Sequence, residues 1–245
     1  MMVIILFFCF TFAMGMNVPE GIPICHKSDP NLGDCMAKSI ETSLKFLAQG
    51  NKELGLPVLE PMFVKDMEIG GSTGKSVSLQ QKYHNVKVHG MTNSKIKVLN
   101  IDLEKGCSWR MNISSPTIRL EGEYEMQGQV LVFPMNAKGK CNVTQYNLHN
   151  VHTVTCERYT KKGQTYMRLT NYTLDMKLED IHYEFTDLFP GNQQISDEIL
   201  KTLNDNGLAI FNEIKAGFES VFGYMEMQTH NNIMSKFTED QLFPQ

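Results

Sequence analysis

Few residues in this chain have the types and spacing that catalysis or metal binding requires. The sequence contains no His-Glu-x-x-His motif and no Cys-x-x-Cys pair, and no cysteine stands in a known nucleophile context. His149 and His152 lie three residues apart in a segment with a strand-like pattern. Residues at that spacing face opposite sides of a strand, so the two imidazoles are not placed to share a metal ion. The sequence therefore predicts neither a catalytic site nor a metal site.

A second candidate for chemistry is the segment GGSTGKS at 70–76, which looks like a phosphate-binding loop. That motif requires a glycine five positions before Gly74, and Ile69 stands there. A strand-like pattern follows the segment, whereas a phosphate-binding loop opens a helix. We therefore expect no bound nucleotide, and no other cofactor motif is present.

Disulfide formation is the one reaction that the sequence favours. Once a signal segment containing Cys9 is removed, five cysteines remain: Cys25, Cys35, Cys107, Cys141 and Cys156. Cys25 and Cys35 bracket a short polar turn segment and are predicted to pair, which stabilises the fold by roughly 3 kcal/mol in the chain-entropy model. Among the other three, a bridge between Cys141 and Cys156 fits a hairpin that turns midway between them, but the sequence leaves this pairing open.

The N-terminus and three glycosylation sequons indicate export. Residues 1–15 are apolar, uncharged and too short to cross a bilayer, which is typical of a secretory signal cut near Gly15. No later stretch is apolar enough to anchor the chain, so residues 16–245 are expected to form one secreted domain. The sequons begin at Asn112, Asn142 and Asn171. Asn112 and Asn171 alternate with apolar neighbours and are expected to face solvent. The third sequon, at Asn142, lies beside Cys141, and its neighbours give no such indication.

Charge and composition exclude several partners. The formal net charge is −4, and no basic block offsets it, so neither nucleic acid nor an anionic membrane is an expected partner. A hydrophobic content of 42% with 20% charged residues suits a globular chain. We expect a monomer.

Two elements must position any site, and the first is a long strand from Ile118 to Phe133. Its even positions are apolar or glycine and its odd positions are mainly charged or amide side chains, so one face is buried and the other faces solvent. At about 3.3 Å per residue the run would span roughly 50 Å, and a strand of that length twists and curves. A long, curved, one-sided sheet needs an apolar element in its concavity.

The second element is a helical pattern that starts at Ser196. Apolar residues recur at helical spacing from Ile199 to Met225 and cover a broad stripe of roughly 140° at 100° per residue. The segment Asn204-Asp-Asn-Gly207 opposes helix, and we expect one long helix with local strain there. A shorter helix is predicted from Asp34, as its cap, to about Gln49.

Several segments, in this order and spacing, resemble the insect takeout and juvenile-hormone-binding proteins. They are the close pair Cys25 and Cys35, then GNKELGLPVLEP at 50–61, Gly122-x-Tyr124-x-x-x-Gly128, LFPGNQQISDEILKTLNDNG at 188–207 and the closing QLFPQ. The resemblance implies an α+β, TULIP-like fold, in which a strongly curved antiparallel sheet wraps a long helix around an elongated hydrophobic tunnel. No cysteine follows Cys156, so the more C-terminal second bridge of the haemolymph hormone carriers is absent. This departure favours the takeout side of the family.

The function predicted from these observations is a secreted carrier of a small lipophilic ligand, such as a terpenoid, a fatty-acid-like molecule or a juvenile-hormone-like molecule. The alternative is a secreted interaction or signalling protein whose tunnel is filled by its own side chains. The candidate wall residues are Tyr124, Met126 and Val130 from the strand and Phe211, Phe218 and Phe222 from the helix. Plain core packing is the alternative role for each of them.

Overall fold

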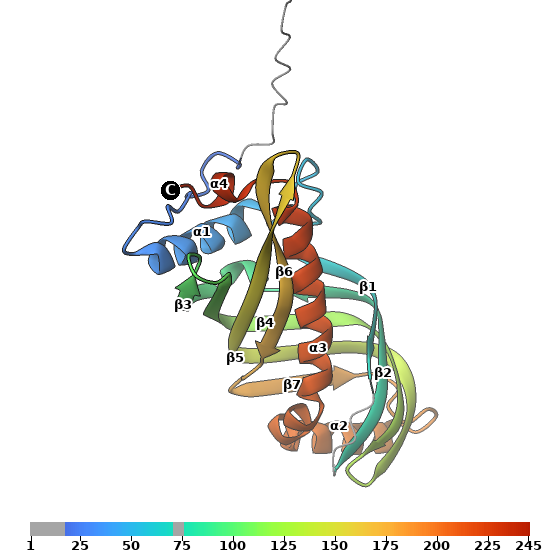
Figure 1. Cartoon of the computed structure of the whole chain (residues 1–245). Helices are drawn as coiled ribbons and strands as arrows, with labels where there is room; N and C mark the ends of the chain where they lie inside the picture. The colour runs from blue at the N-terminus through green and yellow to red at the C-terminus, as the bar shows by residue number, and fades with distance from the viewer. Residues whose placement is uncertain (1–17, 71–75) are drawn as a thin grey trace, which may run out of the picture.

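Seven strands form one antiparallel sheet, and the helices lie in its concavity or along its margins (Figure 1). The computed structural model describes residues 18–70 and 76–245. The strands are β1 (Met62–Ile69), β2 (Val77–His89), β3 (Lys95–Asp102), β4 (Ser108–Val130), β5 (Phe133–Lys161), β6 (Gln164–Asp175) and β7 (Asp180–Phe185). The helices are α1 (Leu32–Phe46), α2 (Gln193–Asp205), α3 (Gly207–Met234) and α4 (Glu239–Leu242), with a 3-10 turn η1 (Met91–Asn93). The α+β class and the curved antiparallel sheet are as predicted.

Two unusually long strands, β4 and β5, form the ribbon on which the sheet is built. One half of this ribbon is flanked by β2 and β7, and the other half by β3 and β6, while β1 extends the sheet beyond β2. The β4–β5 ladder is interrupted between the halves at Pro116 and Asn147. Proline has no N–H to donate, and Asn147 has a φ of 48°, so neither residue continues a regular ladder. The interruption separates the two halves of the sheet.

The predicted strand 118–133 is confirmed in its buried face but not in its end. Tyr124 and Met126 are 1% and 6% exposed, as the alternation requires. The strand stops at Val130, because Leu131 and Val132 form a tight turn into β5. Leu131 adopts a positive φ of 53°, and Val132, predicted on the buried face, is 81% exposed.

The prediction of one long C-terminal helix is wrong, because the chain forms α2 and α3 with a break at Asn206. The backbone of Asn206, with φ −119° and ψ 18°, lies outside the helical region. The side chain of Asn204 accepts a hydrogen bond from the backbone N–H of Tyr183 and donates one to its carbonyl, at 2.8 and 2.9 Å. These bonds tie the last turn of α2 to β7. The helix also starts earlier than predicted, with Asn192 as its cap.

The first helix, α1, begins at Leu32 and ends at Phe46, so it is shifted toward the N-terminus from the predicted range. Asp34 lies in its first turn and is not the cap, a position that Asn31 takes. The helix packs against β3 and η1.

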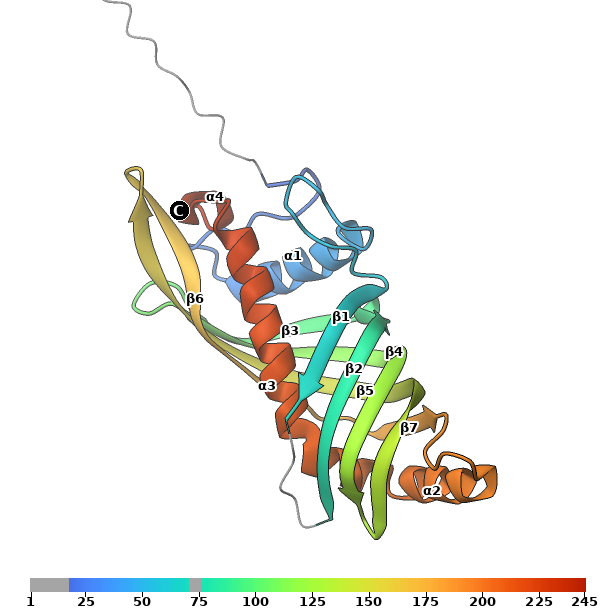
Figure 2. The same ribbon diagram turned by 90° about the vertical axis from the view of Figure 1, so that its right-hand side faces the viewer.

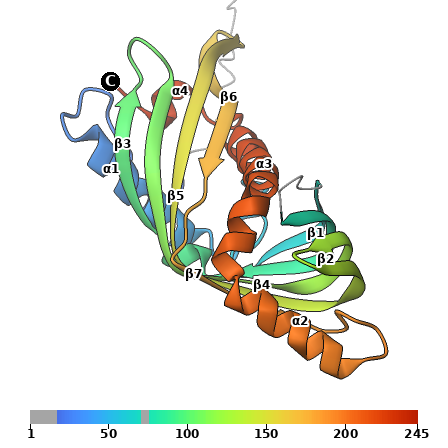
Figure 3. The same cartoon turned by 90° about the horizontal axis from the view of Figure 1, so that it is seen from below.

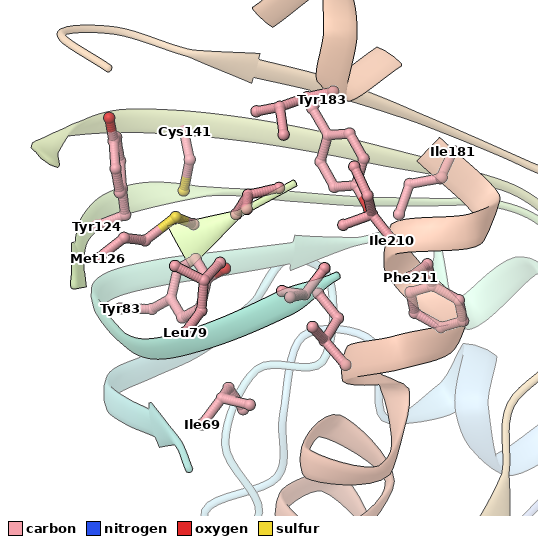
Figure 4. Packing of buried hydrophobic residues seen from close by; sticks show 14 of the residues in the cluster. Ile69, Leu79, Tyr83, Tyr124, Met126, Cys141, Ile181, Tyr183, Ile210 and Phe211 are labelled. Atoms are coloured by element: carbon pink, nitrogen blue, oxygen red, sulfur yellow. The ribbon is translucent and has the colours of Figure 1, made fainter. Parts of the chain in front are cut away.

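Helix α3 lies in the hollow of the sheet, between β6 on one side and β1 on the other (Figures 2 and 3). Apolar residues of α3 and of the strands form one cluster, which contains Ile210 and Phe211 at one end and Tyr124 and Met126 at the other (Figure 4). The predicted strand face and helical stripe therefore share one interior. A polar side chain of the helix also pairs with backbone at the end of β6: the Glu219 carboxylate accepts a hydrogen bond from the N–H of Met176, the residue after this strand, at 2.8 Å.

Two disulfides are present in the described residues. Cys25 and Cys35 are bridged as predicted, with Cα atoms 5.7 Å apart. The pairing of Cys141 with Cys156, which fitted the sequence, is wrong: Cys156 pairs with Cys107, and Cys141 is a buried free thiol. The register of the β4–β5 ribbon explains the result, because it places Cys141 opposite Gly122.

Candidate functional site

Three cavities lie in a row along α3. The inner chamber is bounded by β1, β2, β4, β5 and β7 together with the start of α3, and its wall includes Met67, Leu79, Met126, Val130, Phe211 and Phe218. The middle chamber lies against β4, β5 and β6, and its wall includes Met111, Ile118, Leu148, His152, Tyr172 and Phe222. The outer chamber lies beside α1 and the segment 18–24, and its wall includes Val18, Ile24, Leu44, Leu56, Met225 and Phe237.

Shared wall residues show that the chambers adjoin. Leu120 and Gln145 line both the inner and the middle chamber. Met62, Met91 and Phe222 line both the middle and the outer chamber. The volume open to the centre of a water-sized sphere is about 50 Å³ in the inner, 180 Å³ in the middle and 320 Å³ in the outer chamber. The arrangement is therefore an elongated, mainly apolar hollow in three parts.

Aromatic side chains from one face of α3 stand along this hollow. Phe218 and Phe222 are one helical turn apart and stack, with ring centroids 6.3 Å apart and planes inclined by 17°. Phe218 also lies 6.3 Å from the ring of Tyr83 on β2. Because Phe218 lines the inner chamber and Phe222 lines the other two, the stacked pair occupies the boundary between the chambers.

Five of the six candidate wall residues line a chamber. Met126, Val130, Phe211 and Phe218 line the inner chamber, and Phe222 lines the middle and outer chambers. That they bind a ligand stays a prediction.

Tyr124, the sixth candidate, lines none of the three chambers in the described residues. It is a core residue, and its ring packs edge-on against Phe185 with the centroids 4.9 Å apart. Its hydroxyl donates a hydrogen bond to the carbonyl of Thr186 at 2.6 Å. The expected role of this hydroxyl, selection among ligands, is therefore not supported, since the protein's own backbone already occupies it.

Polar side chains in the hollow are the feature that the sequence reasoning missed. Gln81 is 1% exposed; its carbonyl accepts a hydrogen bond from the Tyr83 hydroxyl at 2.8 Å, while its Nε2 has no partner among the described residues. His152 is 5% exposed, and its Nδ1 lies 2.6 Å from the Tyr172 hydroxyl. Gln81 is in phase with Val77, Leu79 and Tyr83, and His152 is in phase with Leu148 and Val154. A polar residue at an inward strand position was thus the available signal.

Burial keeps the reactive groups of the hollow uncharged. Desolvation, followed by the charge of His230, lowers the pKa of His152 to about 3, so this imidazole is neutral at physiological pH. Burial also raises the pKa of the Cys141 thiol, in the inner chamber, to about 11. A protonated thiol is the opposite of an activated nucleophile. The electrostatics therefore suit retention of an apolar molecule better than covalent chemistry.

The other predicted sites fall outside the hollow or outside the described residues. His149 is exposed and His152 is buried, so the two imidazoles face opposite sides as expected. Within 18–70 and 76–245, no group of three or more His, Cys, Asp or Glu side chains is placed to hold a metal, and no helix is long and apolar enough to cross a membrane. Most of the segment that looks like a phosphate-binding loop, and the predicted signal at 1–15, lie outside the described residues.

The three sequons differ in how free their amides are. Asn171 is exposed, whereas the Asn112 amide is half-buried and donates a hydrogen bond to Ser114 at 3.1 Å. The Asn142 amide donates one to Glu184 at 2.7 Å. Glycosylation stays a prediction at all three, and Asn171 has the most accessible side chain.

Comparison with known proteins gives consistent matches. Residues 3–244 match the family model for haemolymph juvenile hormone binding protein. The circadian clock-controlled protein daywake of Drosophila melanogaster is 24% identical over 199 residues, which cover 77% of this chain and 75% of that protein. Daywake of Drosophila yakuba is 23% identical over 184 residues, covering 72% of this chain and 71% of that protein. The crystal structure of Epiphyas postvittana Takeout 1 superposes with a TM-score of 0.79 at 20% identity, covering 91% of this chain and 99% of that one.

Proposed function

Because the chain belongs to the haemolymph juvenile hormone binding protein family, we propose that it is a secreted carrier of one small hydrophobic molecule, held in the three adjoining chambers. The observation that carries the proposal is the row of three adjoining, mainly apolar chambers along α3. In an ordinary close-packed core, apolar side chains contact one another. Along α3 they border cavities instead, and Phe218 and Phe222 are both half-buried.

Burial alone supplies enough free energy for a carrier. A ligand of about fifteen carbons gains roughly 0.8 kcal/mol for each buried methylene, or about 12 kcal/mol in total. Lost rigid-body freedom and ordering cost at least ~4 kcal/mol, which leaves at most about 8 kcal/mol and corresponds to micromolar binding. A terpenoid, a fatty-acid-like molecule or a juvenile-hormone-like molecule would meet this requirement.

Export fits this proposal. The predicted signal would be cut near Gly15 and release residues 16–245 as one domain. Disulfides persist in oxidising compartments, so the bridges Cys25–Cys35 and Cys107–Cys156 support export. The acidic balance of the chain, −4 at neutral pH, gives no reason to expect nucleic acid as a partner. We propose that the carrier is a monomer.

Titration with an environment-sensitive fluorescent fatty acid or terpenoid probe tests the proposal. Wild-type protein should bind about one equivalent with micromolar affinity, because one molecule is proposed to occupy the three adjoining chambers. Phe218→Trp, which places an indole at the inner chamber, should transfer excitation energy to the bound probe, whereas Tyr224→Trp on the exposed side of the same helix should transfer less.

Absence of binding by every lipophilic probe would contradict the carrier function. It would favour the alternative of a secreted interaction protein whose hollow is filled by its own side chains.

A further inference from the structure

The middle chamber contains a buried imidazole with one nitrogen free. His152 projects from the concave face of β5, and its Nε2 has no hydrogen-bond partner among the described residues. An unpaired polar atom at a site only 5% exposed destabilises the fold, because it has lost its hydrogen bonds to water. Such an atom in the wall of a cavity is either paired by something that enters the cavity or is a permanent loss of stability.

Hydrogen-bond accounting assigns the proton of this imidazole. The hydroxyl of Tyr172 has one partner in the described residues, the Nδ1 of His152 at 2.6 Å. If Nδ1 donated to it, both the hydroxyl proton and the Nε2 lone pair would be left unpaired. If the hydroxyl donates to Nδ1, only one group is unpaired, the N–H at Nε2. The second arrangement leaves fewer buried groups unsatisfied, so His152 presents a donor to the chamber.

An acceptor faces the chamber from the same strand. Asn150 lies two residues before His152 on the inward face of β5, and its Oδ1 is also buried without a partner. Other hydroxyls of this wall are already paired: Ser94 donates to the Met91 carbonyl, and the Ser94 and Ser115 oxygens lie 2.7 Å apart. Among the fully buried side-chain atoms of this wall in the described residues, one donor and one acceptor therefore lack a partner, two residues apart on β5.

We propose that the middle chamber binds the hydroxyl group of an otherwise apolar alcohol, which accepts a hydrogen bond from His152 Nε2–H and donates one to Asn150 Oδ1. This inference rests on the proposed carrier function and specifies the ligand class. A hydroxyl satisfies both free groups, an ether or a ketone only the donor, and a hydrocarbon neither. A carboxylate fits poorly, since it has no proton for Asn150 and the Glu226 side chain also lines this chamber.

Three ligands with the same number of non-hydrogen atoms separate these contributions: 1-tridecanol, methyl dodecyl ether and tetradecane. Their affinities are measured by displacement of a fluorescent probe from wild type, His152→Phe and Asn150→Leu. Comparing wild type with variant for each ligand cancels the differences in the ligands' own hydration. His152→Phe should weaken the alcohol and the ether about tenfold relative to tetradecane. Asn150→Leu should weaken the alcohol by a similar factor and leave the ether unchanged.

A matched control is His149→Phe, the same change on the outward face of the same strand, which should alter none of the three affinities. His152→Gln keeps an N–H donor and should retain most of the alcohol affinity. If His152→Phe does not fold, the imidazole ¹⁵N resonances of wild type decide: Nε2 should shift with 1-tridecanol and not with tetradecane.

The inference would be overturned if His152→Phe lowered the affinity for all three ligands equally, because His152 would then have only a structural role. It would also be overturned if the Nε2 resonance did not shift when the alcohol was added. In either case the carrier function stands, since the ligands bind. If no ligand displaces the probe from wild type, the carrier function itself fails.

Discussion

Phe222 forms the boundary between the middle and outer chambers, and its removal should lengthen the ligand that the protein accepts. The ring lines both chambers and stacks on Phe218 at 6.3 Å. Phe222→Ala removes one of the side chains that line both chambers and opens space between them. A longer alkyl chain could then bury methylenes that the wild-type ring excludes.

The cost in stability is moderate. Replacing a fully buried phenylalanine by alanine costs about 3–5 kcal/mol. Phe222 is half-buried and already borders empty space on two sides, so fewer contacts are lost, while the stacked pair contributes about 0.5–1.5 kcal/mol. We expect the free energy of unfolding to fall by about 2 kcal/mol, and denaturant titration measures it.

The gain in ligand length is measured with a series of straight-chain alcohols in the probe-displacement assay. Each newly buried methylene adds up to about 0.8 kcal/mol, or nearly fourfold in affinity. Affinity in wild type should stop rising at a chain length where Phe222→Ala still gains up to this factor for each carbon. Tyr224→Ala, which removes a 62% exposed ring from the same helix, should leave the wild-type length dependence unchanged. The reasoning is refuted if folded Phe222→Ala keeps the wild-type length dependence.

Three further predictions concern stability. Gly128→Ala should lower the unfolding free energy by about 2–4 kcal/mol in a denaturant titration, because φ is +133° there and a Cβ would collide with a backbone oxygen of β2; an unchanged midpoint would contradict this. Replacing Cys107 and Cys156 together by serine should cost about 4 kcal/mol in the chain-entropy model for a separation of 49 residues, and equal melting of variant and wild type would refute it. Burial alone would raise the pKa of the Glu239 carboxyl, but its hydrogen bonds to Arg158, at 3.0 Å, hold the pKa below 4.5. The ion pair therefore stabilises the fold above pH 4.5, and this stabilisation is lost as the pH falls through the lowered pKa. The difference in unfolding free energy between wild type and Glu239→Gln should disappear in acid, and a difference that persists there would contradict the prediction.

The period-two pattern of residues 118–130 was sufficient to predict the buried face of this part of β4, because its inward positions are apolar or glycine and its outward positions are charged or amide side chains. The turn after it was not predictable in the same way. Neither Leu131 nor Val132 is of a residue type that favours turns. Leu131 adopts its positive φ because β4 and β5 pair on both sides of it. The turn then determines the register that pairs Val130 with Phe133. That register also places Cys107 beside Cys156, so the misjudged turn and the misjudged disulfide have one cause.

The helix break and the polar chamber wall depended on contacts between distant segments. The sequence predicted strain in the helix at Asn204–Gly207. That the helix breaks there follows from the hydrogen bonds of Asn204 to the backbone of Tyr183, which the sequence does not show. The inward position of His152 was readable from strand phase, whereas its unpaired nitrogen was not, because that depends on the partners that β6 and α3 bring to the chamber.

The most direct test of the carrier function is the mass of the protein as it is secreted. The full chain is expressed for secretion in eukaryotic cells, purified without detergent and measured by native mass spectrometry, and an organic extract of the same sample is analysed alongside. The native mass should exceed the denatured mass by that of one lipophilic molecule, which the extract should contain at up to one equivalent. Equal native and denatured masses, together with an empty extract and no uptake of an added lipophilic probe, would contradict the carrier function.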